Sequence, residues 1–160
     1  MRHLFVLASL VLAAVLGGPT ACGSGEKAST DAFSDRLQSI GERGSEQWGR
    51  LAQEADDLEA GDPVPTKVRQ ALTELLTFQK QAESELAALT PPEGAEEAVE
   101  LLIEALAERT ETLEQVLEQR RFTAQTAERI TQAGEKIDRA FEELRSKGFL
   151  ASSNEHKDEE

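Results

Sequence analysis

The stretch from Glu93 to Lys147 most constrains the fold, because it contains no proline and only two glycines, Gly94 and Gly134. Most of its apolar residues recur at steps of three and four, which places them on one face of a helix. The stripe consists of Val99, Leu102, Leu106, Arg109, Leu113, Val116, Arg120, Thr123, Ala127, Ile130, Gly134, Ile137, Phe141 and Leu144. The stretch is therefore predicted to be helical throughout, apart from any turn.

Residues 91–147 could form one helix or two. One helix would be about 85 Å long at about 1.5 Å per residue, roughly twice the length of the helices expected before it. Half of it, with Ile137 and Phe141, would then lack a partner within the chain. The stripe also becomes polar locally, at Arg120, Arg121 and Thr123, where a turn would be tolerated. We therefore favour a turn over residues 118–123, which gives an all-α, antiparallel four-helix bundle. The alternative is three helices with one long C-terminal helix, and it predicts a homodimer.

The first helix is expected to follow the capping residues Ser29, Thr30 and Asp31 and to end at residues 60–63. Its stripe comprises Phe33, Leu37, Ile40, Gly44, Trp48, Leu51, Ala55 and Leu58. Three glycines, Gly41, Gly44 and Gly49, each weaken it by about 1 kcal/mol relative to alanine. They predict a bend or break of the helix between residues 40 and 45, and we interpret them as a site of close helix packing or a kink rather than as a functional hinge.

The remaining helix ends are predicted from proline and glycine. A second helix begins near Pro65, with an apolar stripe that reaches Leu89. A third begins at Pro91, where Thr90 and Glu93 have the spacing of a capping box. The last helix ends at Gly148, and the two apolar residues after it are expected to fold back on its final turn. The segment Leu86, Leu89, Pro91, Pro92 also resembles the hinge of uncharacterised exported helical proteins of bacteria, which implies this fold and no activity.

The amino-acid composition favours helices, and the net charge limits the classes of partner that the chain could bind. Ala, Leu, Glu, Gln and Arg, all good helix formers, dominate, and candidate strands are missing. The chain has a formal charge of −14, and since Arg2 is the only charged residue in the first 21, the remainder carries −15. We expect such a domain to repel nucleic acid and anionic lipid headgroups. Attachment to a membrane would need something other than charge.

The beginning of the chain has the pattern of an export signal. Arg2 precedes an apolar run at residues 4–16 that is too short to span a bilayer, and small residues follow it up to Cys22. This junction resembles a bacterial lipoprotein signal, although Pro19 stands where that family usually has an aliphatic residue. The resemblance implies cleavage before Cys22, the only cysteine, and lipid attachment to it. A free thiol, or one that pairs between chains, is the other reading.

These boundaries divide the chain into four parts. Residues 1–21 are predicted to be a signal peptide, and residues 22–29 a linker after the lipid. Residues 30–150 form the helical bundle domain, and residues 151–160 a disordered acidic tail.

Residues that could support catalysis or bind a cofactor or metal are scarce. Beyond the signal the only histidine is His156, in the tail, so zinc, haem and paired-metal sites lack ligands. Ser24 and Lys27 match one motif of penicillin-binding enzymes, but they lie in a predicted linker without its companion motifs. Two acidic clusters are interpreted as solvated helix ends: Glu54, Asp56, Asp57, Glu59 and Asp62, and Glu93, Glu96, Glu97 and Glu100. We expect no enzyme, no cofactor and no metal.

Arg109 and Arg120 are the least expected members of the apolar stripe. Such an arginine usually buries its stem and keeps its charged head at the boundary. The other interpretation is an interior polar pair, joined to a Glu of another helix or forming a pocket for an anion.

Two hypotheses of function remain. The first is a non-enzymatic lipoprotein, held on the outer face of a bacterial cell membrane by lipid on Cys22, which acts as a scaffold or binds an unknown envelope protein. The second is a module that binds a small ligand or a cation inside the bundle, against which the sparse aromatic residues count.

Overall fold

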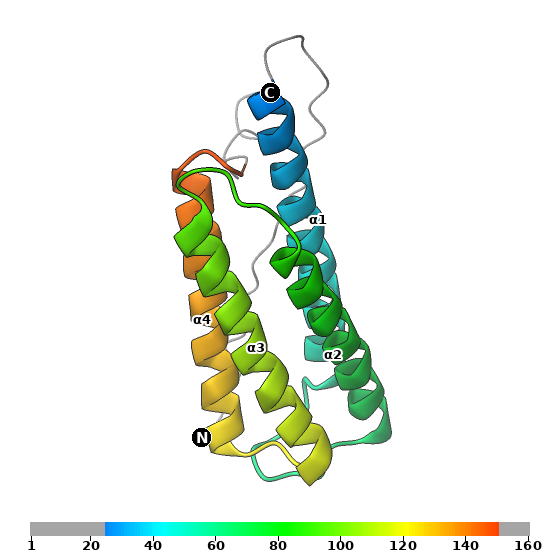
Figure 1. Cartoon of the computed structure of the whole chain (residues 1–160). Coiled ribbons are helices and arrows are strands. Elements are labelled where there is room, and N and C mark those ends of the chain that lie inside the picture. Colours follow the sequence, from blue (N-terminus) through cyan, green and yellow to red (C-terminus); the bar gives the residue numbers. More distant parts are fainter. Residues whose placement is uncertain (1–24, 151–160) are drawn as a thin grey trace, which may run out of the picture.

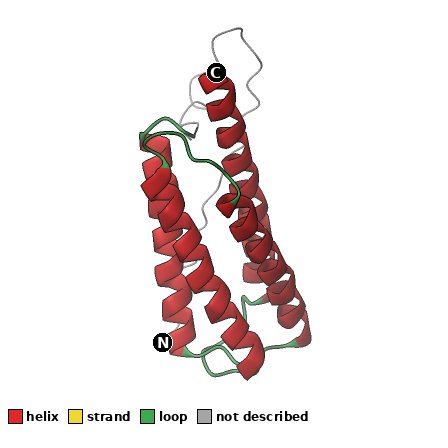
Figure 2. Cartoon of the chain, in the orientation of Figure 1, coloured by secondary structure: helices red, strands yellow, loops and turns green. Residues whose placement is uncertain are grey.

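The computed structural model describes residues 25–150 and, among them, the side chains from Thr30 onward. Four helices make up this part of the chain: α1 (Gly25–Glu54), α2 (Thr66–Ala87), α3 (Glu96–Gln119) and α4 (Ala124–Ser146). They run alternately up and down, with the loops at the two ends (Figures 1 and 2). The all-α four-helix prediction is confirmed, and the single long C-terminal helix is wrong. None of the described helices is long and apolar enough to cross a membrane.

The turn between α3 and α4 lies within the predicted interval of residues 118–123. Arg120 ends α3 in the left-handed conformation, with φ of 52°. Thr123 caps α4: its hydroxyl accepts a hydrogen bond from the Thr126 backbone N–H at 3.1 Å, and the Thr126 hydroxyl accepts one from the Thr123 backbone N–H at 2.9 Å. This reciprocal cap satisfies donors that a helix start leaves free. Arg120 and Thr123, two of the polar residues that interrupt the apolar stripe, therefore form the turn between α3 and α4.

The loop between α1 and α2 packs against this turn. The Gly61 backbone N–H donates to the Phe122 carbonyl oxygen at 2.7 Å, and the Val64 N–H donates to the Arg120 carbonyl oxygen at 2.9 Å. Both connections lie at the same end of the bundle (Figure 1). The backbone bonds join α1 and α2 to α3 and α4 there.

The third helix begins later than predicted. It starts at Glu96 rather than Pro91, and its N-cap, Ala95, makes no side-chain capping bond. A residue that precedes proline is disfavoured in the helical conformation, and Pro91 precedes Pro92. Gly94 then has φ of +89°, which interrupts the chain again. The predicted capping box at Thr90 is therefore wrong.

The first helix begins and ends earlier than predicted and has no break. It ends at Glu54 rather than at residues 60–63. It begins at Gly25, before the predicted caps at residues 29–31, and continues through residues 40–45 without a break. Gly44 explains one of the glycines: a Cβ there would lie 3.3 Å from Cε1 of Phe78. Of the two structural interpretations of these glycines, the structure therefore shows close packing of α1 on α2 at Gly44. A Cβ at Gly49 would contact nothing within 4 Å.

The last helix closes as predicted. Gly148 has φ of +80°, and the Phe149 backbone N–H donates to the Leu144 carbonyl oxygen at 2.9 Å. The Phe149 ring then packs edge-on against Phe33, with 6.1 Å between ring centroids. This contact joins the end of α4 to α1.

The core consists of two apolar clusters, one toward each end of the bundle. The first contains Phe33, Leu37, Ile40, Ala82, Leu86, Ala95, Ala98, Val99, Leu102, Ala105, Leu106, Ile137, Ala140 and Leu144. The second contains Leu51, Ala55, Leu58, Val64, Val68, Ala71, Leu72, Leu75, Leu113, Val116, Phe122 and Ile130. Between them, α2 and α3 contribute buried polar residues.

Candidate functional site

A layer of polar residues crosses the bundle between the two apolar clusters. We call it the central polar layer; it consists of Trp48 from α1, Gln79 and Glu83 from α2, Arg109 and Thr110 from α3, and Asp138 from α4. Gln79 is completely buried and Thr110 is 8% exposed. Buried polar groups of this kind are costly unless they are hydrogen-bonded, so their partners decide what the layer does.

Gln79 and Arg109 form the centre of this layer. The hydrogen bonds are satisfied when the Gln79 amide oxygen faces Arg109 and accepts from Nε at 2.8 Å and from Nη2 at 3.1 Å. The amide nitrogen then donates to the Thr110 hydroxyl at 3.1 Å. That hydroxyl donates in turn to a Glu83 carboxylate oxygen at 2.5 Å. A chain of hydrogen bonds therefore runs from a cation to an anion through two neutral side chains.

Arg109 also stacks on an aromatic ring. Its guanidinium carbon lies 5.2 Å from the centroid of the Trp48 ring, within the range of a cation–π contact. Burial lowers the pKa of Arg109 to about 10, and the nearby Asp138 carboxylate opposes that shift. The residue as a whole keeps a minor part of its surface accessible, although its charged group is largely dehydrated. At neutral pH it remains a cation.

Asp138 is the least satisfied carboxylate of the central polar layer. Burial raises its pKa; the Arg109 charge opposes the rise, and the charges of Glu142 and Glu135 add to it. Among the described residues, Asp138 forms no ion pair within 4.0 Å. The short-range partners of the Arg109 guanidinium are therefore a neutral amide and an aromatic ring, and the Asp138 carboxylate acts on it without forming an ion pair.

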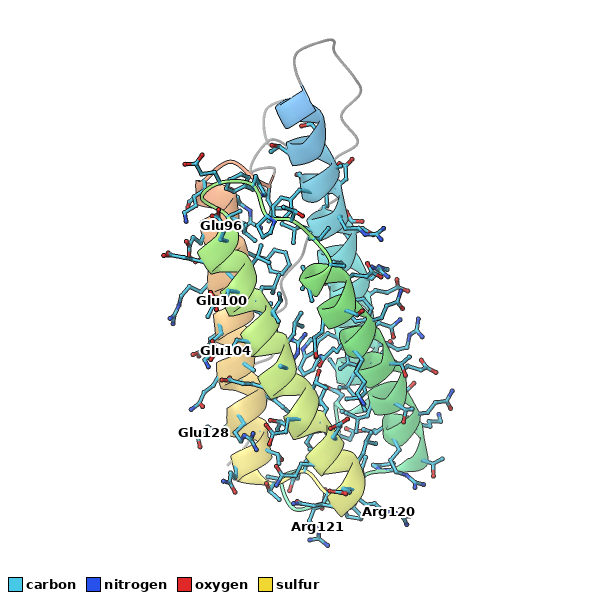
Figure 3. The ribbon with its side chains drawn as sticks, viewed as in Figure 1. Glu96, Glu100, Glu104, Arg120, Arg121 and Glu128 are labelled. Atoms are coloured by element: carbon cyan, nitrogen blue, oxygen red, sulfur yellow. The ribbon has the colours of Figure 1, made fainter. Side chains whose placement is uncertain are left out.

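Arg120 does not join Arg109. It is exposed at the end of α3, where Figure 3 shows it beside Arg121 at the tip of the bundle. The predicted interior pair is therefore wrong for Arg120, because the stripe position falls on the residue that ends the helix. Arg109 does lie inside, but its nearest hydrogen-bonding partner is Gln79 rather than a glutamate.

Sequence reasoning missed Gln79, Thr110 and Asp138. Gln79 had a detectable signal: it lies four residues after Leu75 and three before Ala82, so it occupies the apolar stripe of α2. A polar residue at such a position predicts a buried partner. Thr110 and Asp138 carry no comparable signal, because their positions adjoin the stripe rather than interrupt it.

A shallow depression of about 380 Å³ lies between α3 and α4. It is lined by Glu108, Glu111, Thr112, Arg129, Gln132 and Lys136. Lys136 Nζ lies 2.6 and 2.8 Å from the two Glu108 carboxylate oxygens, and Arg129 pairs with Glu111 at 3.5 Å. The charges of the depression are thus largely paired with one another, as in a solvated interface between two helices.

The acidic cluster of Glu93, Glu96, Glu97 and Glu100 lies at the start of α3. Glu96 and Glu97 occupy the first turn of α3, and Glu96, Glu100 and Glu104 continue along its outer edge (Figure 3). The Lys147 ammonium, at the end of α4, donates a hydrogen bond to the Gly94 carbonyl oxygen at 2.9 Å, just before the start of α3. The hydrogen bond between Lys147 and Glu143 raises the pKa of Lys147. Within residues 25–150, no group of three or more His, Cys, Asp or Glu could hold a metal ion.

Several predicted features lie outside the described residues. They are the signal peptide at residues 1–21, the lipid attachment residue Cys22, Ser24, the tail at residues 151–160 and His156 within it. Lys27 belongs to α1, although its side chain is not described. No protein-family model, curated protein or solved structure matches this chain.

Proposed function

We propose that this protein is a lipoprotein, anchored by lipid on Cys22 to the outer face of a bacterial cell membrane, and that its helical bundle is a non-enzymatic scaffold or protein-interaction module. The observation that carries the anchor is the order of residues 2–22: a positive start, a short apolar run, small residues and the single cysteine. A diacylglyceryl group supplies the two chains that stable anchoring needs, which one short chain does not.

The chemistry of the described domain supports an interaction role. Its hydrogen-bonded interior residues pair with one another: Gln79 with Arg109, and Thr110 with Glu83. Of the two arginines that suggested a pocket for an anion, Arg109 is stacked on Trp48 and bonded to Gln79, and Arg120 is exposed at the end of α3. The outer surface, by contrast, carries most of the charge. A domain of this kind acts through its surface, and an envelope protein is the partner class that the proposed location implies.

The anchor is tested by expression of the full-length chain in a bacterial host beside a Cys22→Ala variant. Intact mass and partition between membrane and soluble fractions are measured for both. We expect a mature mass that begins at Cys22 with added lipid, and membrane partition that the variant loses. An unmodified chain in the soluble or secreted fraction would refute the anchor and leave Cys22 as a thiol.

A further inference from the structure

The first helix begins very close to the residue that the proposed anchor uses. α1 starts at Gly25, so residues 25–29, part of the predicted linker, belong to the helix. Only Gly23 and Ser24 separate this start from Cys22. An extended chain spans at most about 3.6 Å per residue, so the Gly25 Cα lies within about 11 Å of the Cys22 Cα. A lipid on Cys22 is therefore attached almost directly to a helix.

The start of α1 projects beyond the bundle. Phe33 is the first buried residue among the described side chains of α1, and Asp31 and Ala32 before it are exposed. Residues 25–32 form about 12 Å of helix at about 1.5 Å per residue. Figure 1 shows this dark blue segment extending past the loop between α2 and α3 and past the end of α4. We call residues 25–32 the α1 stalk.

One end of the bundle lies at the base of the α1 stalk. Phe33 packs against Phe149, which follows α4, and the Lys147 ammonium donates to the Gly94 carbonyl oxygen in the α2–α3 loop. We call this the near end; it consists of residues 88–95 and 147–150. The far end consists of residues 55–65 and 120–123, which are joined by backbone hydrogen bonds. The two ends are separated by the length of α3, which is about 35 Å for its 24 residues.

The distribution of charge favours an upright bundle over one that lies along an anionic lipid surface. Exposed carboxylates follow α3 over its whole length, and α1 and α4 also carry them; those of α3 are Glu96, Glu97, Glu100, Glu104, Glu111, Glu114 and Glu118. On α2 three cations balance three carboxylates, but α1 and α3 flank it. A bundle on its side would bring these carboxylates to headgroups that repel them. Upright, even the near end stands off by the stalk, about 12 Å, which exceeds the screening length of about 8 Å at physiological salt.

We infer that the α1 stalk holds the bundle upright on the membrane, with the near end toward the lipid headgroups and the far end about 35 Å further out. This inference rests on the proposed lipid on Cys22. The surface that the near end faces is the lipid bilayer. The far end, with the exposed Arg120 and Arg121, is the part of the domain that an envelope protein reaches first (Figure 3).

The test uses the full-length lipidated chain, inserted from detergent into preformed vesicles of phosphatidylcholine and phosphatidylglycerol that contain a headgroup-labelled acceptor lipid. Because the lipid occupies the Cys22 thiol, a second cysteine can be labelled selectively with a donor dye. Thr90→Cys places the donor at the near end, and the matched variant Gln119→Cys places it beside the far end; both native side chains are exposed. Circular dichroism checks that each variant keeps its helices.

Energy transfer from the donor to the acceptor lipid reports how far each end lies from the headgroups. We expect transfer from position 90 to be at least about 2-fold more efficient than from position 119, because about 35 Å of helix separates them. In a second pair of labelled chains, a Gly–Ser segment of about 20 residues is inserted after Ser24, with an r.m.s. length of about 25 Å. The two efficiencies should then become similar, because the helix no longer starts beside the lipid.

Three outcomes would overturn the inference. Equal transfer from the two positions without the insertion would mean that the bundle lies along the surface. Stronger transfer from position 119 would mean that the far end faces the lipid. A difference that the insertion leaves unchanged would mean that something other than the α1 stalk orients the bundle. Failure of the anchor itself is distinguishable, since a chain without lipid would bind no vesicles, transfer no energy from either position and show an unmodified intact mass.

Discussion

Replacement of Gln79 by Leu tests whether the central polar layer is held as described. Gln79 is completely buried and accepts two hydrogen bonds from Arg109, at 2.8 and 3.1 Å. Leu is of similar size but leaves the guanidinium without this acceptor. Each hydrogen bond to a charged group contributes about 1.5–3 kcal/mol, and part of that is offset by the apolar area that Leu adds. We expect Gln79→Leu to lower the free energy of unfolding by about 2–4 kcal/mol.

The second half of this test removes both partners. In the double variant Gln79→Leu, Arg109→Met, no buried charge is left without a partner, while Thr110 can still donate to Glu83. Replacing both partners by apolar groups is often close to neutral, so the double variant should be more stable than Gln79→Leu alone by at least about 1 kcal/mol. Arg109→Met alone completes the double-mutant cycle.

Urea unfolding followed by circular dichroism measures all four proteins. The matched control is Gln81→Leu on the exposed face of the same helix, where the amide bonds only to Glu85 at 2.8 Å; it should change stability by less than about 0.5 kcal/mol. The reasoning is refuted if Gln79→Leu costs no more than this control. It is also refuted if the double variant is the least stable of the set, since Arg109 would then stabilise the fold without Gln79.

Three further predictions concern single positions. Gly134→Ala should raise the free energy of unfolding by about 1 kcal/mol, because a Cβ there would contact no atom within 4 Å. Gly44→Ala should gain less or lose stability, because a Cβ there would lie 3.3 Å from Cε1 of Phe78. Equal gains for the two variants in urea unfolding would contradict this. Arg120→Gly should stabilise by about 0.5–1 kcal/mol, since φ of 52° suits glycine and the backbone hydrogen bonds remain, and an unchanged unfolding midpoint would count against it. The raised pKa of Asp138 means that the folded state binds this proton more tightly than the unfolded state, so its contribution to stability falls as pH rises above 3.8 through the raised value. Unfolding free energies measured from about pH 4 to about pH 7 should therefore show a difference, wild type minus Asp138→Asn, that decreases with pH; a difference that increases would mean the pKa is lowered instead.

Much of the fold could be predicted because it depends on periodicity, which is local. Apolar residues at steps of three and four predicted the helices, and the polar residues after Val116 predicted the turn that Arg120 and Thr123 form. The start of α3 could not be predicted by the same means. A capping box at Thr90 and two prolines competed for the same residues, and the restriction that Pro92 places on Pro91 decided the outcome.

The central polar layer was only partly predictable, because it depends on which residues of different helices lie at the same level. Arg109 was recognisable as a charge within an apolar stripe. Its partner Gln79 lies 30 positions earlier, and nothing in the sequence states how far α2 and α3 are displaced along each other. The role of Thr110 depends on its hydrogen bonds to Gln79 and Glu83, which its position in the sequence does not indicate. Helix alignment is a property of the packed chain rather than of any one segment.

The same layer determines which alignment of α2 and α3 is adopted. Along both helices the apolar residues repeat so regularly that a slide of one heptad would still place leucine against leucine over much of the contact. Such a slide would bring Arg109 beside Leu72 or Leu86 instead of Gln79, leaving a guanidinium against hydrocarbon and a buried amide without its acceptor or donor. Apolar helix surfaces can pack in several alignments. The hydrogen bonds of Gln79 disfavour the alignments that are shifted by one heptad. The central polar layer therefore selects one alignment of α2 and α3.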